Sequence, residues 1–139
     1  MITLRNLGLQ NRNPLNLRYQ PRHRYRGLHP TQPCVKGFCN FLTFDHGYRA
    51  ALIEMVRLIR HYPRITVVQM ISCLTTLPHH QFTLYVACIC GRSRLSAFET
   101  LCVEGPQIGR LVAAMAQQET GLHPTPEYMD HLRKQFGIF

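Results

Sequence analysis

Hydrophobic residues recur at helical spacing most clearly between Asp45 and Tyr62. Five of them lie four, three, four and three residues apart and form one face of a helix: Tyr48, Leu52, Met55, Ile59 and Tyr62. Thr43 or Asp45 can cap the start of this helix, and Pro63 ends it. Three early residues are small and leave room for another segment to approach closely: Gly47, Ala50 and Ala51.

Three further helices are expected between residues 67 and 103. One covers Val67–Leu74 with Thr66 as N-cap, and the next covers about His80–Cys90 and ends at Gly91. The sequence Ser96–Glu99 has the form of a capping box and predicts a short helix as far as residue 103.

The last helix starts at Thr125-Pro126-Glu127, which combines a cap, a first-turn proline and a first-turn acid, and it ends before Gly137. Residues 1 to about 37 are loop-rich, because prolines and glycines interrupt them densely. Segments 15–19 and 38–42 alternate in polarity, so they either pair as a short β-hairpin or remain extended. We therefore expect one mainly α domain, 1–139, with a helical core over 38–139.

Glu119 occupies an unusual place in the remaining helix, Gln107–Gln118. Four apolar residues form the stripe of that helix: Ile108, Leu111, Val112 and Met115. Glu119 continues the stripe, and Gly121 is the expected C-cap, which puts the acid in the last turn. Burial and the negative end of the helix dipole both favour the protonated carboxyl. Such an acid suits a glycosidase, which must protonate a leaving-group oxygen. The alternative is a helix-end Glu that turns into water.

The charge of the chain is strongly asymmetric. The net charge is +9, and no acid precedes Asp45. Seven basic residues fall before it: Arg5, Arg12, Arg18, Arg22, Arg24, Arg26 and Lys36. This third of the chain should be attracted to polyanions, such as nucleic acid, anionic cell-wall polymers or an acidic partner protein. The alternative is a solvated basic face.

The six cysteines are expected to be reduced thiols, with Cys73, Cys88 and Cys102 packed as small hydrophobes. Cys34 and Cys39 lie near two histidines, but their spacing matches no zinc motif, so no metal or other cofactor is expected. The first ten residues lack the apolar stretch of a signal peptide, and no apolar run reaches the roughly 18 residues of a membrane span. We expect synthesis in the cytoplasm, with delivery to a cell wall by another route or as part of a virion.

A cluster of asparagines surrounds Pro14. Asn11, Asn13 and Asn16 give this turn several amide donors and acceptors, which suit sugars and their N-acetyl groups. Alternatively, the amides satisfy the backbone of their own turn.

Five segments in order resemble a small family carried by phages, prophages and Bacteroidales-type genomes and often labelled phage structural proteins. They are Asn11–Arg18, Tyr25–Leu28, Phe38–Phe41, Gly47–Ala51 and Ala114–Gly121. A looser similarity links the Asn-rich turn and the Gly-Tyr-Arg-Ala helix start to lysozyme-like glucosaminidases and transglycosylases. In those enzymes the catalytic Glu precedes the Asn-rich turn, whereas Glu119 follows it. The resemblance therefore implies a circularly permuted lysozyme-like fold.

This resemblance implies a peptidoglycan-cleaving domain in which Glu119 is the general acid. Asn13 and Asn16 would orient the sugar or the attacking water, and Arg18 and Tyr48 are candidates for the cleft wall, although Tyr48 also fits a core position. No other acid is placed as a nucleophile, so a single-acid mechanism is expected.

The chain departs from the family in one stretch and contains no Trp. Cys73–Pro78 stands where the family has Trp-Ala-Pro-Pro, and the Asn-Asp-Thr that follows it is also replaced. The losses favour a second hypothesis, a non-enzymatic virion, delivery-apparatus or cell-wall-binding protein of the same fold. A third is a nucleic-acid-binding protein, supported by Tyr19 and Tyr25 among the N-terminal arginines.

Overall fold

A computed structural model describes residues 2–22 and 24–138 of the chain. Within these ranges the fold is mainly α, as the sequence predicts. It has six helices and one two-stranded sheet: α1 (Leu4–Gln10), β1 (Cys34–Val35), β2 (Phe38–Cys39), α2 (Phe44–His61), α3 (Val67–Leu74), α4 (His79–Ser93), α5 (Gln107–Thr120) and α6 (Pro126–Phe136).

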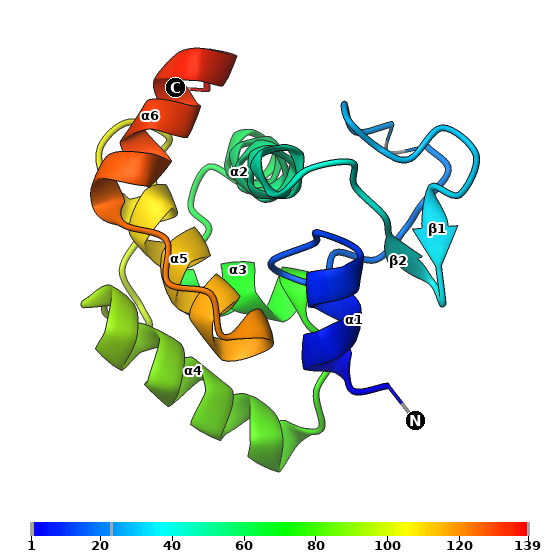
Figure 1. Ribbon diagram of the computed structural model, residues 1–139. Coiled ribbons are helices and arrows are strands. Elements are labelled where there is room, and N and C mark those ends of the chain that lie inside the picture. Colours follow the sequence, from blue (N-terminus) through cyan, green and yellow to red (C-terminus); the bar gives the residue numbers. More distant parts are fainter. Residues whose placement is uncertain (1, 23, 139) are drawn as a thin grey trace.

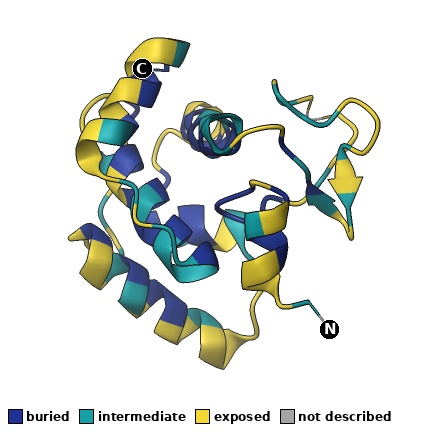
Figure 2. Cartoon of the chain, in the orientation of Figure 1, coloured by how far each residue is buried: buried dark blue, intermediate teal, exposed yellow. Residues whose placement is uncertain are grey.

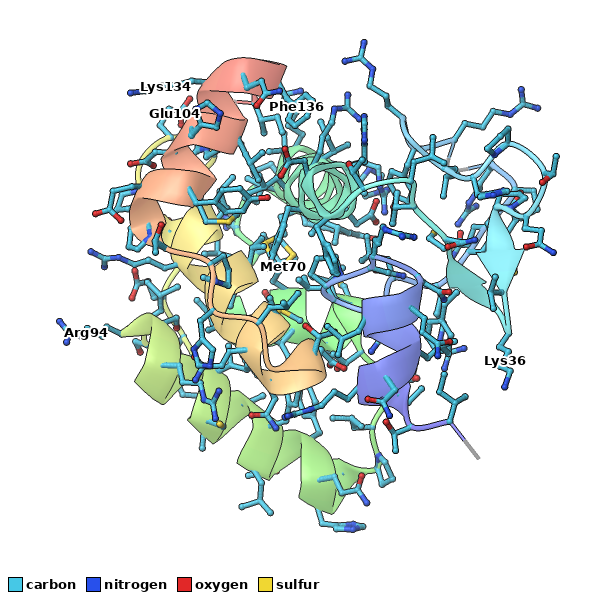
Figure 3. The ribbon with its side chains drawn as sticks, in the orientation of Figure 1. Lys36, Met70, Arg94, Glu104, Lys134 and Phe136 are labelled. Carbon is cyan, nitrogen blue, oxygen red and sulfur yellow. The ribbon has the colours of Figure 1, made fainter. Side chains whose placement is uncertain are left out.

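Helix α5 is the central element, because it contacts α1, α2, α4 and α6. Figure 1 shows α4 and α6 along its outer sides and the small sheet on the opposite side of the molecule. The helices turn buried residues inward and exposed residues outward (Figure 2). Met70 of α3 is fully buried and lies in the middle of the molecule (Figure 3). Both predicted stripes face one shared core, to which α2 contributes Tyr48, Leu52, Met55 and Ile59 and α5 contributes Ile108, Leu111, Val112 and Met115. Tyr62, the last residue of the predicted α2 stripe, is instead 52% exposed, so the prediction is wrong at that position.

The thin first turn of α2 packs against the Asn-rich turn, as expected from its small residues. Thr43 caps the helix by accepting a hydrogen bond from the His46 N–H. A Cβ at Gly47 would lie only 2.1 Å from the carbonyl oxygen of Arg12. Only glycine permits this approach, so Gly47 fixes the Asn-rich turn on α2.

Helix α1 was not predicted, and the expectation that residues 1–37 lack regular structure is wrong over Leu4–Gln10. Thr3 caps this helix through a hydrogen bond from the Asn6 N–H. Leu7 and Gly8 are buried, and a Cβ at Gly8 would lie 2.7 Å from the methyl group of Thr120. The helix has seven residues, which is too short for a periodic pattern, and its contact with α5 stabilises it.

Two predicted helix features are wrong between residues 90 and 103. Helix α4 continues past Gly91 to Ser93 and ends at Arg94, which takes a left-handed conformation. The predicted helix after Ser96 is absent from this described stretch, although Glu99 does accept a hydrogen bond from the Ser96 N–H. The carbonyls of Ala97 and Glu99 instead accept hydrogen bonds from the first N–H groups of α3. Helices α3 and α6 match their predicted caps.

The sheet pairs Cys34–Val35 with Phe38–Cys39. Segments 15–19 and 38–42, for which the sequence left a hairpin or an extended conformation open, meet beside it at an isolated bridge and do not form a strand pair of their own. Arg18 bridges Phe38, and the Leu17 carbonyl accepts a hydrogen bond from the Cys39 N–H. Cys39 is buried, but Cys73 and Cys102 are exposed and Cys88 is half-buried, so the predicted packing of those three is wrong.

No helix in the described part of the chain is both long and apolar enough to cross a bilayer. Over residues 2–22 and 24–138, no three His, Cys, Asp or Glu side chains are grouped to hold a metal ion.

Candidate functional site

Glu119 lies in the last turn of α5, where the sequence places it. Gly121 caps the helix in a left-handed conformation, and its N–H donates to the Gln117 carbonyl. The Glu119 side chain is half-buried, and both of its oxygens accept hydrogen bonds. The Tyr85 hydroxyl donates to Oε1 at 2.8 Å, and the Asn16 amide donates to Oε2 at 3.5 Å. The carboxyl thus joins α4, α5 and the Asn-rich turn.

Burial raises the pKa of Glu119 above its ordinary value, in the predicted direction. The hydrogen bonds from Tyr85 and Asn16 act the other way, because they stabilise the charged form, but burial is the larger effect. Burial and the nearby carboxyl raise the pKa of Tyr85 as well. Tyr85 therefore keeps its proton and remains a donor to Glu119 near neutral pH.

The carboxyl opens onto a surface hollow of about 500 Å³ between α4 and α5. Its lining residues come mainly from these two helices: Leu77, Gln81, Leu84, Tyr85, Cys88, Gln118 and Glu119. The Gln118 side chain already accepts a hydrogen bond from the Cys88 thiol at 3.1 Å. The hollow therefore combines an acid of raised pKa, two side-chain amides and two leucines. We call it the Glu119 hollow.

Asn16 reaches Glu119 because its backbone is left-handed, with φ of 52°. Its amide also donates to the Leu4 carbonyl at 3.1 Å, so it ties the start of α1 to the end of α5. Gly8 faces the same amide, and a Cβ there would lie 2.8 Å from Asn16 Oδ1. The position of Asn16 thus depends on α1, which the sequence did not reveal.

Asn13 serves its own turn. Its amide donates to the carbonyls of Leu17 and Cys39 at 3.0 and 3.1 Å, and its oxygen accepts from the Leu17 N–H at 2.9 Å. The side chain is fully buried. These bonds match the structural alternative for the Asn-rich turn, and the described hydrogen bonds of Glu119 come from Tyr85 and Asn16 and not from Asn13.

Arg18 and Tyr48 lie away from the Glu119 hollow. Arg18 is exposed, donates to the Thr76 hydroxyl at 3.2 Å, and stacks over Phe38 at 5.1 Å. Tyr48 is 4% exposed and packs edge-on against Tyr128, with ring centroids 5.4 Å apart. Burial raises the pKa of Tyr48 to about 12. Tyr48 is therefore a core residue.

The acids with described partners are engaged elsewhere. Asp45 accepts a hydrogen bond from the Tyr128 hydroxyl, and Glu54 forms an ion pair with Arg57 at 2.5 Å. Glu99 accepts from the Gln107 amide at 2.7 Å, which helps to lower the pKa of Glu99. Of the described residues that line the Glu119 hollow, only Glu119 carries a carboxyl.

Tyr85, Gln81 and Gln118 are the site residues that the sequence did not indicate. Tyr85 lies within the predicted helix of about His80–Cys90, and a tyrosine at a buried position needs a partner for its hydroxyl. That requirement is the one signal that pointed to an acceptor on a neighbouring helix. The two glutamines carry no such signal.

Comparison of the chain with protein-family models and with curated protein sequences finds no match.

Proposed function

We propose that this protein cleaves glycosidic bonds of peptidoglycan, with Glu119 as the general acid. One observation carries the proposal: the half-buried Glu119 carboxyl, whose pKa is raised by burial, opens onto a hollow of about 500 Å³. A carboxyl with a raised pKa keeps its proton to a higher pH than an ordinary glutamic acid, and it can donate that proton to a glycosidic oxygen as the bond breaks. Its position at a surface hollow lets a substrate reach it.

The two donors to Glu119 fit this role. While the carboxyl is protonated, the bond from Tyr85 holds its orientation. Once the proton leaves, the same bond and the bond from Asn16 stabilise the carboxylate, because both donors point at its oxygens. Tyr85 and Asn16 thus ease the proton transfer by supporting its product.

After Glu119 has donated its proton, the attack on the sugar does not use another carboxylate of the protein in this proposal. Glu119 is the only described acid that lines the hollow, so the substrate acetamido group or a water molecule completes the reaction. In this proposal the amides of Gln81 and Gln118, which line the hollow, hold N-acetyl groups, whereas the sequence analysis gave the orientation of the sugar to Asn13 and Asn16.

A non-enzymatic wall-binding or virion protein is the second candidate. The observation in its favour is that both Glu119 oxygens already accept hydrogen bonds, as in a structural buried carboxylate. In either case we propose synthesis in the cytoplasm, delivery with phage or secretion-apparatus proteins, and recruitment to an anionic wall polymer by the exposed N-terminal arginines. Nucleic acid is the third candidate ligand of those arginines.

Clearing of a turbid suspension of purified peptidoglycan tests the proposal. We expect the wild-type protein to clear the suspension and Glu119→Gln to leave it turbid, because the amide cannot donate a carboxylic proton. Glu127→Gln is the matched control, since Glu127 is exposed in the first turn of α6, and it should clear at the wild-type rate. A folded wild-type protein that leaves peptidoglycan from several wall types turbid would support the non-enzymatic candidate.

A further inference from the structure

Two more hollows lie next to helix α3, outside the Glu119 hollow. The larger has about 660 Å³ and lies between the end of α2 and α3. Its lining residues are His61, Tyr62, Pro63, Arg64, Ile65, Gln69, Ser72 and Cys73. The smaller has about 220 Å³ and is lined from the N-terminal loops, α2 and the end of α3 by Leu17, Arg18, Gln20, Tyr25, Glu54, Cys73, Leu74 and Thr76.

The three hollows follow one another along a single stretch of chain. The larger hollow shares Cys73 with the smaller one, which reaches Thr76, and the Glu119 hollow begins at the next residue, Leu77. We call this succession the α3 path, from Tyr62 through Cys73 and Thr76 to Glu119.

The charge of the α3 path favours an anionic ligand. Arg64 and Arg18 line it, and neither forms an ion pair with any described residue. Among the described residues that line the larger and the smaller hollow, Glu54 is the one acid. Arg57 forms an ion pair with it at 2.5 Å, and the Tyr25 hydroxyl donates a hydrogen bond to it at 2.9 Å. The Glu54 carboxylate is thus neutralised within the protein. Arg18 is held by its hydrogen bond to Thr76 and its contact with Phe38, but neither its charge nor that of Arg64 is paired with a described acid.

Tyr62 gives the far end of the path an aromatic surface. It is 52% exposed. Its ring packs edge-on against His61, with centroids 4.5 Å apart. The apolar face of a sugar ring packs on such an exposed aromatic face. Tyr62 therefore offers what a Trp often supplies in a sugar-binding cleft.

We propose that the α3 path binds an extended acidic glycan strand. Tyr62 packs against a sugar ring, and Arg64 and Arg18 contact carboxylates carried by the strand, while a more distant sugar reaches the Glu119 hollow. The choice of a glycan as occupant rests on the proposed function. The path adds that the ligand is a polymer, bound several sugars away from the reacting bond.

Titration calorimetry with soluble, uncrosslinked peptidoglycan strands tests this path separately from catalysis. All variants carry Glu119→Gln, so no strand is consumed. We expect Tyr62→Ala and Arg64→Gln each to weaken binding by about two- to fivefold, as for an exposed contact. The matched controls Phe98→Ala and Arg92→Gln should bind as the parent does, since both side chains are exposed and line none of the three hollows.

Two other ligands make the result specific. A neutral N-acetylglucosamine oligomer should lose affinity in Tyr62→Ala but not in Arg64→Gln, because it carries no carboxylate. Equal affinity of all four variants for the acidic strands, or no binding by the parent, would overturn the proposal. The proposal would also be overturned if the parent bound single-stranded DNA more tightly than peptidoglycan strands and if Tyr62→Ala and Arg64→Gln weakened DNA binding by the same factors. A protein that binds as expected yet fails to clear peptidoglycan would disprove only the catalytic function.

Discussion

The hydroxyl of Tyr85 donates a hydrogen bond of 2.8 Å to Glu119 Oε1, across the interface between α4 and α5. This bond and burial have opposite effects on the pKa of Glu119, because burial raises the pKa and the bond lowers it. The acid is thus held in place by a donor that also supports its charged form.

Replacing Tyr85 with Phe should raise the pKa of Glu119 further. The phenyl ring preserves most of the burial, while one of the two hydrogen bonds that lower the pKa is lost. Titration of the Glu119 side-chain carboxyl by carbon-13 NMR measures the change. Tyr62→Phe is the control and should leave the titration unchanged, since Tyr62 is not among the Glu119 hollow residues. An unchanged or lower pKa in Tyr85→Phe would contradict the role given to the bond.

The pH dependence of stability should differ between the wild type and Glu119→Gln. A raised native pKa means that the unfolded chain loses its proton first as the pH rises. The wild type therefore loses stability as the pH rises above about 4.5, which is the ordinary pKa of a Glu carboxyl. The loss stops growing once the pH has passed the raised pKa of Glu119 in the native protein. Glu119→Gln lacks this loss, so its melting temperature relative to the wild type should rise over that window. A relative melting temperature that falls with pH would show that the native carboxyl has a lowered pKa.

Gly47→Ala should destabilise the fold by about 1–3 kcal/mol, as expected when a tightly packed site receives an extra methyl group. The new Cβ would lie 2.1 Å from a backbone oxygen of the Asn-rich turn, which cannot move without disturbing its own bonds. Gly91→Ala is the matched control. No atom lies within 4 Å of a Cβ at Gly91 in α4, so alanine should stabilise the protein by about 0.5–1 kcal/mol. Urea unfolding of both variants measures the contrast, and similar changes in both would argue against the close packing.

Asn13→Ala should cost about 1–3 kcal/mol of unfolding free energy, because it leaves buried backbone partners at Leu17 and Cys39 without their hydrogen bonds. Asn40→Ala is a suitable comparison, since the Asn40 amide makes a single exposed bond to the Gln32 carbonyl. Its cost should be smaller. If Asn13→Ala keeps full stability but loses binding of peptidoglycan strands, Asn13 is a ligand contact rather than a turn residue.

The sequence predicted best those elements whose signals are local. Helices α2, α3 and α6 each begin at a threonine whose side chain caps the helix, at Thr43, Thr66 and Thr125. The stretch after Ser96 has the local pattern of a helix start but forms no helix, because its carbonyls accept hydrogen bonds from α3, about thirty residues earlier in the chain. No local pattern encodes that competition.

The same distinction holds at the site. Glu119 was predictable, since the apolar stripe of α5 and Gly121 place it within one helix. Its partner Tyr85 lies 34 residues away, and Asn16 lies 103 residues away. Asn13 and Asn16 share one turn, and their opposite roles depend on the left-handed backbone of Asn16 and on α1. Sequence spacing cannot distinguish them.

Mass spectrometry of the fragments released from purified peptidoglycan shows whether Glu119 acts as the general acid. We expect the wild-type protein to release glycan fragments with a newly broken glycosidic bond. The Glu119→Gln protein should release no such fragments. Circular dichroism should show that this variant is folded and that it melts at a temperature equal to or higher than that of the wild type at neutral pH. Release of the same fragments by the folded Glu119→Gln protein would contradict the claim that Glu119 is the general acid.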